Sequence, residues 1–456
     1  MGKLVRASTP LFFRSKLLCS SLSYLFLSLF FAFYTSLSPT TKCHFRSSPL
    51  DPLHSPLFSY PQSYGQHKHP IPSTHSSCNS PVFFSVGFAD YSFVLDEVRR
   101  VIGNSSRDSK GLRYLRGNEN GGTFGMNYTM KKRLSYYDYR DGGIEIPCGF
   151  LKKFPISDYD RIAMESCNGV VVVSAIFGNH DKIRQPRNLG FNTLDDVCFY
   201  MFVDEVTIKQ LYFHNLLSRK TKENRIGAWR IVQVSSEELY ENPAMNGVIP
   251  KYLVHRLFPN SKYSIWIDAK MQLAVDPLLL LHSLVIVEGA DMAISKHPLY
   301  VHTMEEAMAT ARWKKWWDVD SLRIQIETYC EHGLQPWSSK KHPYTSDVPD
   351  SAIILRKHGL GNNLFSCLLF NELGAFNPRD QLAFAFVRDK MNPKMKLNMF
   401  DVEVFEHVAS EYRHNIKQRG SHVTQSVKTK RASPSLLANG AIRTKCDKYL
   451  AELWNE

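Results

Sequence analysis

Six short apolar runs constrain the fold of this chain more than any other feature. Each has the length of a buried strand, and they lie at 170–177, 198–203, 229–234, 263–267, 291–295 and 351–355. Two longer segments between them, 244–258 and 304–333, carry apolar residues at helical spacing. Strands that alternate with helices predict an α/β domain with a largely parallel sheet. In such domains ligands bind beyond the carboxyl ends of the strands.

An uncharged segment near the amino terminus predicts a membrane anchor. No charged residue occurs from Leu17 to Thr41, and a helix of this length, at about 1.5 Å per residue, can cross the hydrocarbon core of a bilayer. Four basic residues precede the segment and two follow it closely, so the positive-inside rule places the body of the chain in the lumen. A cleavable signal peptide is the alternative, although its apolar region is normally shorter.

Composition then divides the chain into five parts. Residues 42–82 are rich in Pro, Ser and His, which is typical of a flexible stem. Two glycosylation sequons follow, at Asn104 and Asn127, and a lumenal location would make both available. We therefore expect a cytosolic tail (1–16), a transmembrane signal-anchor (17–38), a partly disordered lumenal stem (39–135), a folded body (136–414) and a basic tail (415–456).

The net charge of +13 does not lie on the predicted body. Residues 151–414 contain 31 basic and 31 acidic residues, whereas the excess of basic residues lies in 1–150 and 415–456. A protein that binds nucleic acid usually carries its basic residues on the folded domain. The distribution therefore disfavours a nucleic-acid partner.

Eight of the nine cysteines follow the predicted anchor. An even number suits an oxidising compartment, and we expect a disulfide between Cys148 and Cys167, which bracket the start of the body. The alternative is that several are buried thiols. No cluster of Cys and His has the spacing of a structural zinc site.

The sharpest candidate for chemistry is Asp268, which ends the run Tyr263–Ile267 and is followed two positions later by Lys270. Nucleotide-sugar transferases of the GT-A type carry Asp-x-Asp at such a strand end, where a divalent metal such as Mn²⁺ or Mg²⁺ stabilises the charge on the leaving diphosphate. Here Lys270 replaces the second acid and could neutralise the diphosphate itself, which makes a metal cofactor doubtful. The alternative is a salt bridge between the two residues.

The ends of the first two runs supply candidates for donor binding. Phe177, Gly178 and Asn179 end the first run in a tight turn, and a glycine there allows a ligand to approach the backbone. Asp204 ends the second run and could reach a ribose or a base. An ordinary βα turn and a helix N-cap, respectively, are equally good interpretations.

Polar residues late in the body form a further set. Glu372 precedes Arg379, Asp380 and Gln381, and a carboxylate in this region could act as the general base on an acceptor hydroxyl. A helix cap with a surface pair between Arg379 and Asp380 is the alternative.

Three more residues complete the candidates. His297 and Arg356 follow apolar runs directly, and we expect them to bind the donor. His407 could join Asp268 as a metal ligand. A structural role is the alternative for each histidine.

Several motifs, in order, resemble one plant family. They are VVVVSAIFGNHDKIRQP, YSIWIDAKMQLAVDP, SKHPLY, VPDSAIILRKH, NPRDQLAFAFV and FEHVASEYRH. The chain resembles the glycosyltransferase-like family that contains mucilage-related probable hexosyltransferases and a turgor-regulation protein described as an alkaline ceramidase. The likeness covers residues 136–414, and the layout of the chain is most similar to that of the turgor-regulation member.

This resemblance implies a single-pass type II protein of the Golgi membrane with a GT-A-like body. It implies a hexosyltransferase that uses a nucleotide-sugar donor and a glycan or lipid acceptor. Ceramide hydrolysis to a sphingoid base and a fatty acid is the second activity that it implies, and a non-catalytic scaffold is a third interpretation because the Asp-x-Asp motif is altered.

Overall fold

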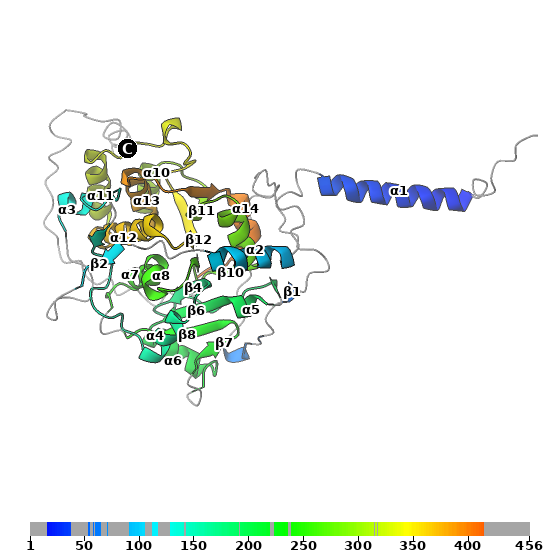
Figure 1. The fold of residues 1–456 in the computed structure, drawn as a ribbon, viewed down its shortest axis with the longest axis horizontal. Helices are drawn as coiled ribbons and strands as arrows, with labels where there is room; N and C mark the ends of the chain where they lie inside the picture. The colour runs from blue at the N-terminus through cyan, green and yellow to red at the C-terminus, as the bar shows by residue number, and fades with distance from the viewer. Residues whose placement is uncertain are drawn as a thin grey trace, which may run out of the picture.

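The computed structural model places an α/β body around one large sheet (Figure 1). It describes residues 16–37, 53–54, 58, 60–64, 71, 91–104, 112–116 and 128–414, the last with gaps at 141–142, 191, 219–222, 236–238, 314 and 317. The predicted basic tail, most of the predicted stem and the sequon at Asn127 lie outside the described residues.

The central sheet has eight strands in the order β13-β11-β12-β9-β4-β6-β8-β7. Their bounds are β4 (Val170–Ile176), β6 (Val197–Val203), β7 (Arg225–Ile226), β8 (Trp229–Gln233), β9 (Tyr263–Ile267), β11 (Met292–Lys296), β12 (Pro349–Lys357) and β13 (Leu397–Phe400). Three two-stranded pairs accompany it: β1 (Leu53–His54) with β5 (Leu189–Gly190), β2 (Leu112–Tyr114) with β3 (Ile144–Ile146), and β10 (Met271–Leu273) with β14 (Ala409–Glu411).

All six predicted apolar runs form strands of this sheet, and the α/β class is confirmed. The prediction of a largely parallel sheet was wrong, because the sheet is mixed. Strands β4, β6, β8 and β9 are parallel neighbours, whereas β12 is antiparallel to both β9 and β11, and β7 is antiparallel to β8. A strand buried on both faces has the same apolar character in either direction, so its sequence does not reveal its orientation.

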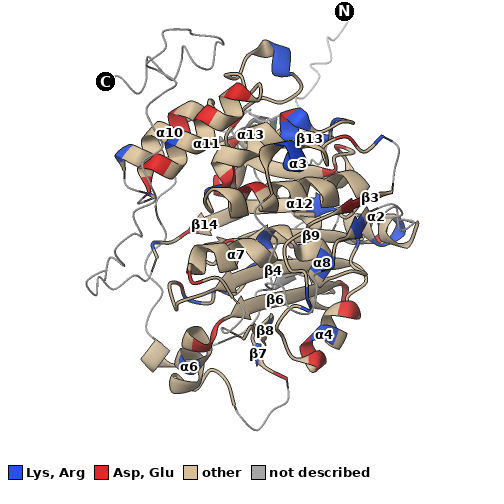
Figure 2. Cartoon of the chain, turned by 90° about the vertical axis from the view of Figure 1, so that its left-hand side faces the viewer, with Lys and Arg blue, Asp and Glu red and all other residues tan. Residues whose placement is uncertain are grey.

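Helices cover both faces of the sheet. On one face lie α4 (Asp158–Glu165), α7 (Pro243–Tyr252), α8 (Val254–Leu257), α10 (Thr303–Arg312), α11 (Val319–Glu331), α12 (Leu360–Ala375) and α13 (Asp380–Lys390). Figure 2 shows α7, α8 and α12 in front of the strands. The other face packs against α2 (Tyr91–Asn104), α6 (Glu205–Phe213), α9 (Pro277–Leu281) and α14 (Val402–Val408). Short helices α3 (Met130–Leu134) and α5 (Thr193–Asp196) complete the body.

Each of the two predicted long helical segments is in fact two helices. The first becomes α7 and α8, which meet at Leu253. The second becomes α10 and α11, and α11 starts afresh because the Asp318 side chain accepts a hydrogen bond from the backbone N–H of Ser321.

At the amino terminus, α1 (Lys16–Leu37) covers most of the predicted anchor. Within the part of the chain that the structure describes, no helix combines the length and the apolar character needed to span a bilayer. Asn104, the first sequon residue, is exposed at the end of α2.

The predicted disulfide between Cys148 and Cys167 was wrong, although both cysteines form disulfides. Cys148 pairs with Cys367 of α12, and Cys167 pairs with Cys198 of β6. Cys167 precedes β4, and Cys198 lies opposite Val171 on the neighbouring strand, so the sheet register brings them together. Parity of cysteines suggests pairing, but connectivity depends on tertiary structure.

Candidate functional site

The carboxyl ends of the central parallel strands define one edge of the sheet. The chain passes from β4 outward to β6 and β8 and then returns to β9 on the other side of β4. This reversal of strand order is a topological switch point, where α/β sheets usually bind their ligands. Because β12 is antiparallel, its amino-terminal end reaches the same edge.

Asp268 lies at this edge, directly after β9. Its backbone N–H donates to the carbonyl of Ala352 at 2.8 Å, which ties the residue to β12. One carboxylate oxygen accepts a hydrogen bond from Trp266 Nε1 at 2.7 Å. The side chain is 30 % exposed, so the strand end is held rigidly while its carboxylate stays accessible to a ligand.

Behind Asp268, a buried ion-pair network centres on Lys251 of α7. Lys251 Nζ lies 2.8 Å from Asp380 Oδ2 and 3.7 Å from Asp268 Oδ1. The same Asp380 oxygen accepts hydrogen bonds from Tyr252 and Ser351, each at 2.7 Å. Ser351 Oγ also accepts a hydrogen bond from Lys251 at 3.0 Å. The network joins α7, the first residues of β12 and the start of α13.

The protonation of this network is set by opposing effects. Burial alone would raise the pKa of Asp380, but the charge of Lys251 and the hydrogen bonds to Asp380 outweigh burial and lower it. Burial would lower the pKa of Lys251, and the two carboxylates beside it raise that pKa instead. Asp380 is therefore a buried, ionised partner that positions Lys251. The prediction that Asp380 acts as general base has no support in this geometry, because a base needs access to the acceptor.

Lys270 supplies a second, more accessible cation. Its Nζ lies 2.8 Å from Glu411 Oε1, and the two side chains are 25 % and 39 % exposed. Burial would lower the pKa of Lys270, but the charges of Asp268 and Glu411 raise it, so the group keeps its proton. Glu411 comes from β14, which pairs with β10 beside the site. The alternative interpretation, a salt bridge from Asp268 to Lys270, is replaced by this pair with Glu411.

The turn after β4 has a structural role. Gly178 and Asn179 both have positive φ, at 67° and 54°. The Gly178 N–H donates to Asp204 at 2.7 Å, and the Asn179 N–H donates to Thr207 Oγ1 at 3.0 Å. Asp204 also caps α6, so the N-cap interpretation of this residue is confirmed. Phe177 is buried. The backbone N–H groups of this turn already form hydrogen bonds within the protein. The prediction that the turn binds the nucleotide-sugar donor therefore has no support.

A second charged cluster lies at the end of β11. Glu306 of α10 is buried. Arg379 Nη2 lies 2.8 Å from one oxygen of the Glu306 carboxylate, and His297 Nε2 lies 3.7 Å from the other. Burial lowers the pKa of His297, with the charge of Glu306 opposing that effect. His297 and Arg379, both predicted to bind the donor, thus lie beside the same carboxylate, and Glu306 already engages both.

Residues 112–414 match the TOD1/MUCI70 family, described as a glycosyltransferase-like domain. The chain belongs to this family. It is 56% identical over 470 residues to "Alkaline ceramidase TOD1" of Arabidopsis thaliana, with both chains fully covered. It is 39% identical over 310 residues to "Probable hexosyltransferase MUCI70" of Arabidopsis thaliana, covering 66% of this chain and 52% of that relative. Mouse xyloside xylosyltransferase 1 aligns at 8% identity with a TM-score of 0.30, over 51% of this chain and 85% of that chain.

In this member of the TOD1/MUCI70 family, three predicted site residues lie elsewhere. Glu372 is 1 % exposed, 3.1 Å from Arg133 and hydrogen-bonded by Tyr329, so its geometry gives the predicted catalytic role no support. Arg356 is also 1 % exposed, with its guanidinium 5.3 Å from the Tyr252 ring centroid, where a donor cannot reach it.

His407 belongs to α14, which packs on the opposite face of the sheet from Lys251. Among the described residues, no group of three candidate metal ligands includes Asp268 or His407. The residues beside Asp268 therefore do not present a preformed metal site. Gln381 is half-buried in the first turn of α13.

Sequence reasoning missed Lys251, Ser351, Glu306 and Glu411. Lys251 had a usable signal, because a single lysine interrupts the apolar segment 244–258, and a lysine on a buried face needs a paired carboxylate. Glu411 had none, since its role depends on the pairing of β14 with β10.

Proposed function

We propose that this chain is a glycosyltransferase that transfers a hexose from a nucleotide sugar to a glycan or lipid acceptor. The observation that carries the proposal is the accessible Asp268 carboxylate between two lysines at the switch point of the sheet. Lys270 would neutralise the donor diphosphate, and Asp268 would hold Lys251 and accept a hydrogen bond from a sugar hydroxyl. The glycosyltransferase-like domain of the family supports the same reaction class.

The proposed donor site does not use a metal ion. A lysine stands where the second acid of Asp-x-Asp would be, and two carboxylates near it, Asp380 and Glu411, are paired with Lys251 and Lys270. We expect donor binding to survive chelation of divalent cations. A donor-induced rise in melting temperature that disappears with a chelator would contradict this part of the proposal.

The proposal is tested by thermal unfolding of the full chain with UDP, GDP and their sugars. Asp268→Asn should abolish both the ligand-induced rise in melting temperature and hexose transfer. The fold should persist, because the Asn side-chain oxygen can still accept the Trp266 hydrogen bond. Asp320→Asn, on an exposed residue of α11, is the matched control. Unchanged transfer by Asp268→Asn would remove this residue from the mechanism.

Ceramide hydrolysis is the second candidate function, and the full-length identity to a relative named alkaline ceramidase favours it. The described site offers one hydroxyl beside a lysine, Ser351 with Lys251 at 3.0 Å. Ser351 is buried, and Lys251 is held protonated, so neither is poised to act as nucleophile or base. Release of fatty acid from ceramide by the wild type, lost in Ser351→Ala, would establish hydrolysis at this site. A folded protein with neither activity would indicate a scaffold.

We also propose that the protein is a single-pass type II protein of the Golgi membrane with its body in the lumen. The uncharged segment 17–41 and its basic flank support this topology. Glycosidase treatment should shift the wild-type protein on a gel, and Asn104→Gln should remove part of that shift. A protein that carries no glycan at either sequon would contradict the proposed orientation.

A further inference from the structure

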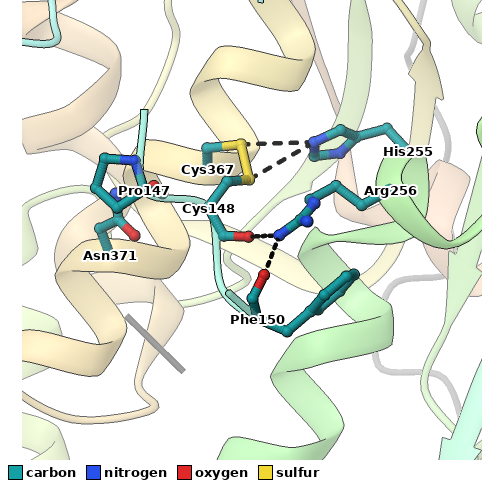
Figure 3. Close-up of a disulfide and its surroundings, with 7 residues drawn as sticks. All are labelled: Pro147, Cys148, Phe150, His255, Arg256, Cys367 and Asn371. Atoms are coloured by element: carbon teal, nitrogen blue, oxygen red, sulfur yellow. Dashed lines mark hydrogen bonds between the residues drawn. A yellow bond between two sulfur atoms is a disulfide. The ribbon is translucent and has the colours of Figure 1, made fainter. Parts of the chain in front are cut away.

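The disulfide between Cys148 and Cys367 lies against a histidine. His255 of α8 points its Nε2 at both sulfur atoms, at 3.8 Å from Cys148 Sγ and 3.5 Å from Cys367 Sγ (Figure 3). All three residues are buried, and their three ligand atoms lie within 4.8 Å of one another. Among the described residues, this is the only group of three Cys, His, Asp or Glu side chains with that spacing.

The segment that carries Cys148 is held in place by contacts other than the disulfide. Arg256 Nη1 donates to the carbonyl of Cys148 and, at 2.6 Å, to that of Phe150. Asn371 Nδ2 donates to the carbonyl of Pro147 at 2.8 Å (Figure 3). These hydrogen bonds clamp the segment to α8 and α12. Breaking the sulfur–sulfur bond therefore leaves both cysteines beside His255.

The distances from the imidazole to the sulfurs match those of a tetrahedral metal site. Zinc binds cysteine sulfur at about 2.3 Å and histidine nitrogen at about 2.0–2.1 Å. A tetrahedral angle between such bonds separates nitrogen and sulfur by about 3.5–3.6 Å, close to the 3.5 and 3.8 Å observed. The imidazole is thus already placed, and only the sulfurs have to move apart. Two thiolates would also balance the charge of a divalent ion in this buried position.

We propose that reduction of the Cys148–Cys367 bond creates a site for a soft divalent metal ion, Zn²⁺, held by both thiolates and by His255 Nε2. A phosphine reductant takes the oxygen of one water molecule, becomes a phosphine oxide, and leaves two thiols. Zinc then replaces the two thiol protons, which pass to solvent. Three protein ligands leave one coordination position for water or an exogenous ligand.

The test compares full-length protein in two redox states. The chain is reduced with a phosphine, incubated with Zn²⁺, desalted, and its zinc content is measured. Reduced wild type should retain one more zinc per chain than oxidised wild type and than reduced His255→Ala. Because His255→Ala removes a direct ligand, it should weaken the affinity for Zn²⁺ by more than the ~10–100-fold typical of replacing a residue that only hydrogen-bonds to a ligand. Equal zinc content in the reduced wild type and the variant would overturn the proposal.

Two further measurements keep the proposal open to refutation if His255→Ala does not fold. Co²⁺ in reduced wild type should show the sulfur-to-cobalt charge-transfer absorption of thiolate ligation, and its absence would reject the site. The Cys167–Cys198 disulfide is the matched control. Cys167 Sγ contacts the carbonyl of Val170, and among the described residues neither of its sulfurs belongs to a group of three candidate metal ligands. Replacing both of its cysteines by serine should leave the bound zinc unchanged, whereas loss of that zinc would assign the ion to the wrong cysteines.

Discussion

Replacing Lys251 by methionine tests how much the buried ion pairs of Lys251 stabilise the fold, separately from the part that this network has in the proposed binding of the donor. Methionine keeps most of the apolar stem of the lysine and removes the charge. At an effective dielectric constant of about 20, a pair at 2.8 Å contributes about 6 kcal/mol and a pair at 3.7 Å about 4.5 kcal/mol before desolvation. The cost of burying the ammonium group offsets several kcal/mol of this sum.

The net effect of Lys251→Met should be a loss of about 3–5 kcal/mol in the free energy of unfolding, because Asp380 would remain buried without a cation. Lys270→Met is the matched control. Its ion pair with Glu411 is partly exposed, and such pairs contribute only about 0–1 kcal/mol. Both variants should weaken the binding of a nucleotide diphosphate, whereas only the first should be strongly destabilised.

Urea unfolding of the full chain at several pH values measures both effects. In Lys251→Met, only the hydrogen bonds from Tyr252 and Ser351 still oppose the effect of burial on Asp380, and we expect its pKa to rise above the unfolded value. The protonated form then stabilises the fold, and this contribution is lost as the pH rises. The deficit relative to wild type should therefore shrink at low pH. A loss below about 1 kcal/mol, or a deficit independent of pH, would refute the interpretation of this network as a buried ion pair.

Three further predictions follow from contacts described above. Replacing Cys148 and Cys367 by alanine should lower the free energy of unfolding by roughly 5 kcal/mol, because this disulfide closes a loop of 219 residues. Removing the other described disulfide, which closes 31 residues, should lower it by roughly 4 kcal/mol. A larger loss from the shorter loop, measured by urea unfolding, would contradict this prediction. The hydrogen bond to Asp181 raises the pKa of His414, so their pairing should be complete below the ordinary histidine pKa and lost as the pH rises through the raised value. An NMR titration should show that Asp181→Asn lowers the pKa of His414, and no change would exclude the pairing. Glu411→Gln should strengthen nucleotide diphosphate binding up to about fivefold, the equivalent of one exposed ion pair, and weaker binding in calorimetry would count against Lys270 as the phosphate contact.

The strands of the body could be predicted from sequence because burial on both faces leaves a continuous apolar run. Strand β9 matches its predicted run residue for residue, and β4 ends one residue earlier than predicted. The orientation of β12 could not be predicted, since its buried run carries no directional signal. The accessible end of the site was therefore predictable at Asp268, which closes β9, whereas the approach of Ser351 to the same edge was not.

The charged residues were harder to assign, because a charge in sequence does not reveal its partner. Glu372 and Asp380 both appeared to be candidates for a base, yet Glu372 pairs with Arg133 in the core, and Asp380 pairs with Lys251. Each partner is more than 100 residues away in sequence. Such pairs form only when helices pack, so the spacing of residues along the chain contains no record of them.

The pair of Lys270 with Glu411 indicates how the proposed site could accept a donor without a metal. In the structure, the Glu411 carboxylate occupies the position beside Lys270 that a phosphate would take, at 2.8 Å. Because the pair is partly exposed, its separation costs only about 0–1 kcal/mol, and a diphosphate brings more negative charge than one carboxylate. Lys251 differs, because its nearest partner, Asp380, is buried, and replacing Lys251 should lower the free energy of unfolding by about 3–5 kcal/mol. In the proposed mechanism, the two lysines beside Asp268 therefore have different roles: Lys251 holds the strand end in place, and Lys270 would leave Glu411 to bind the donor.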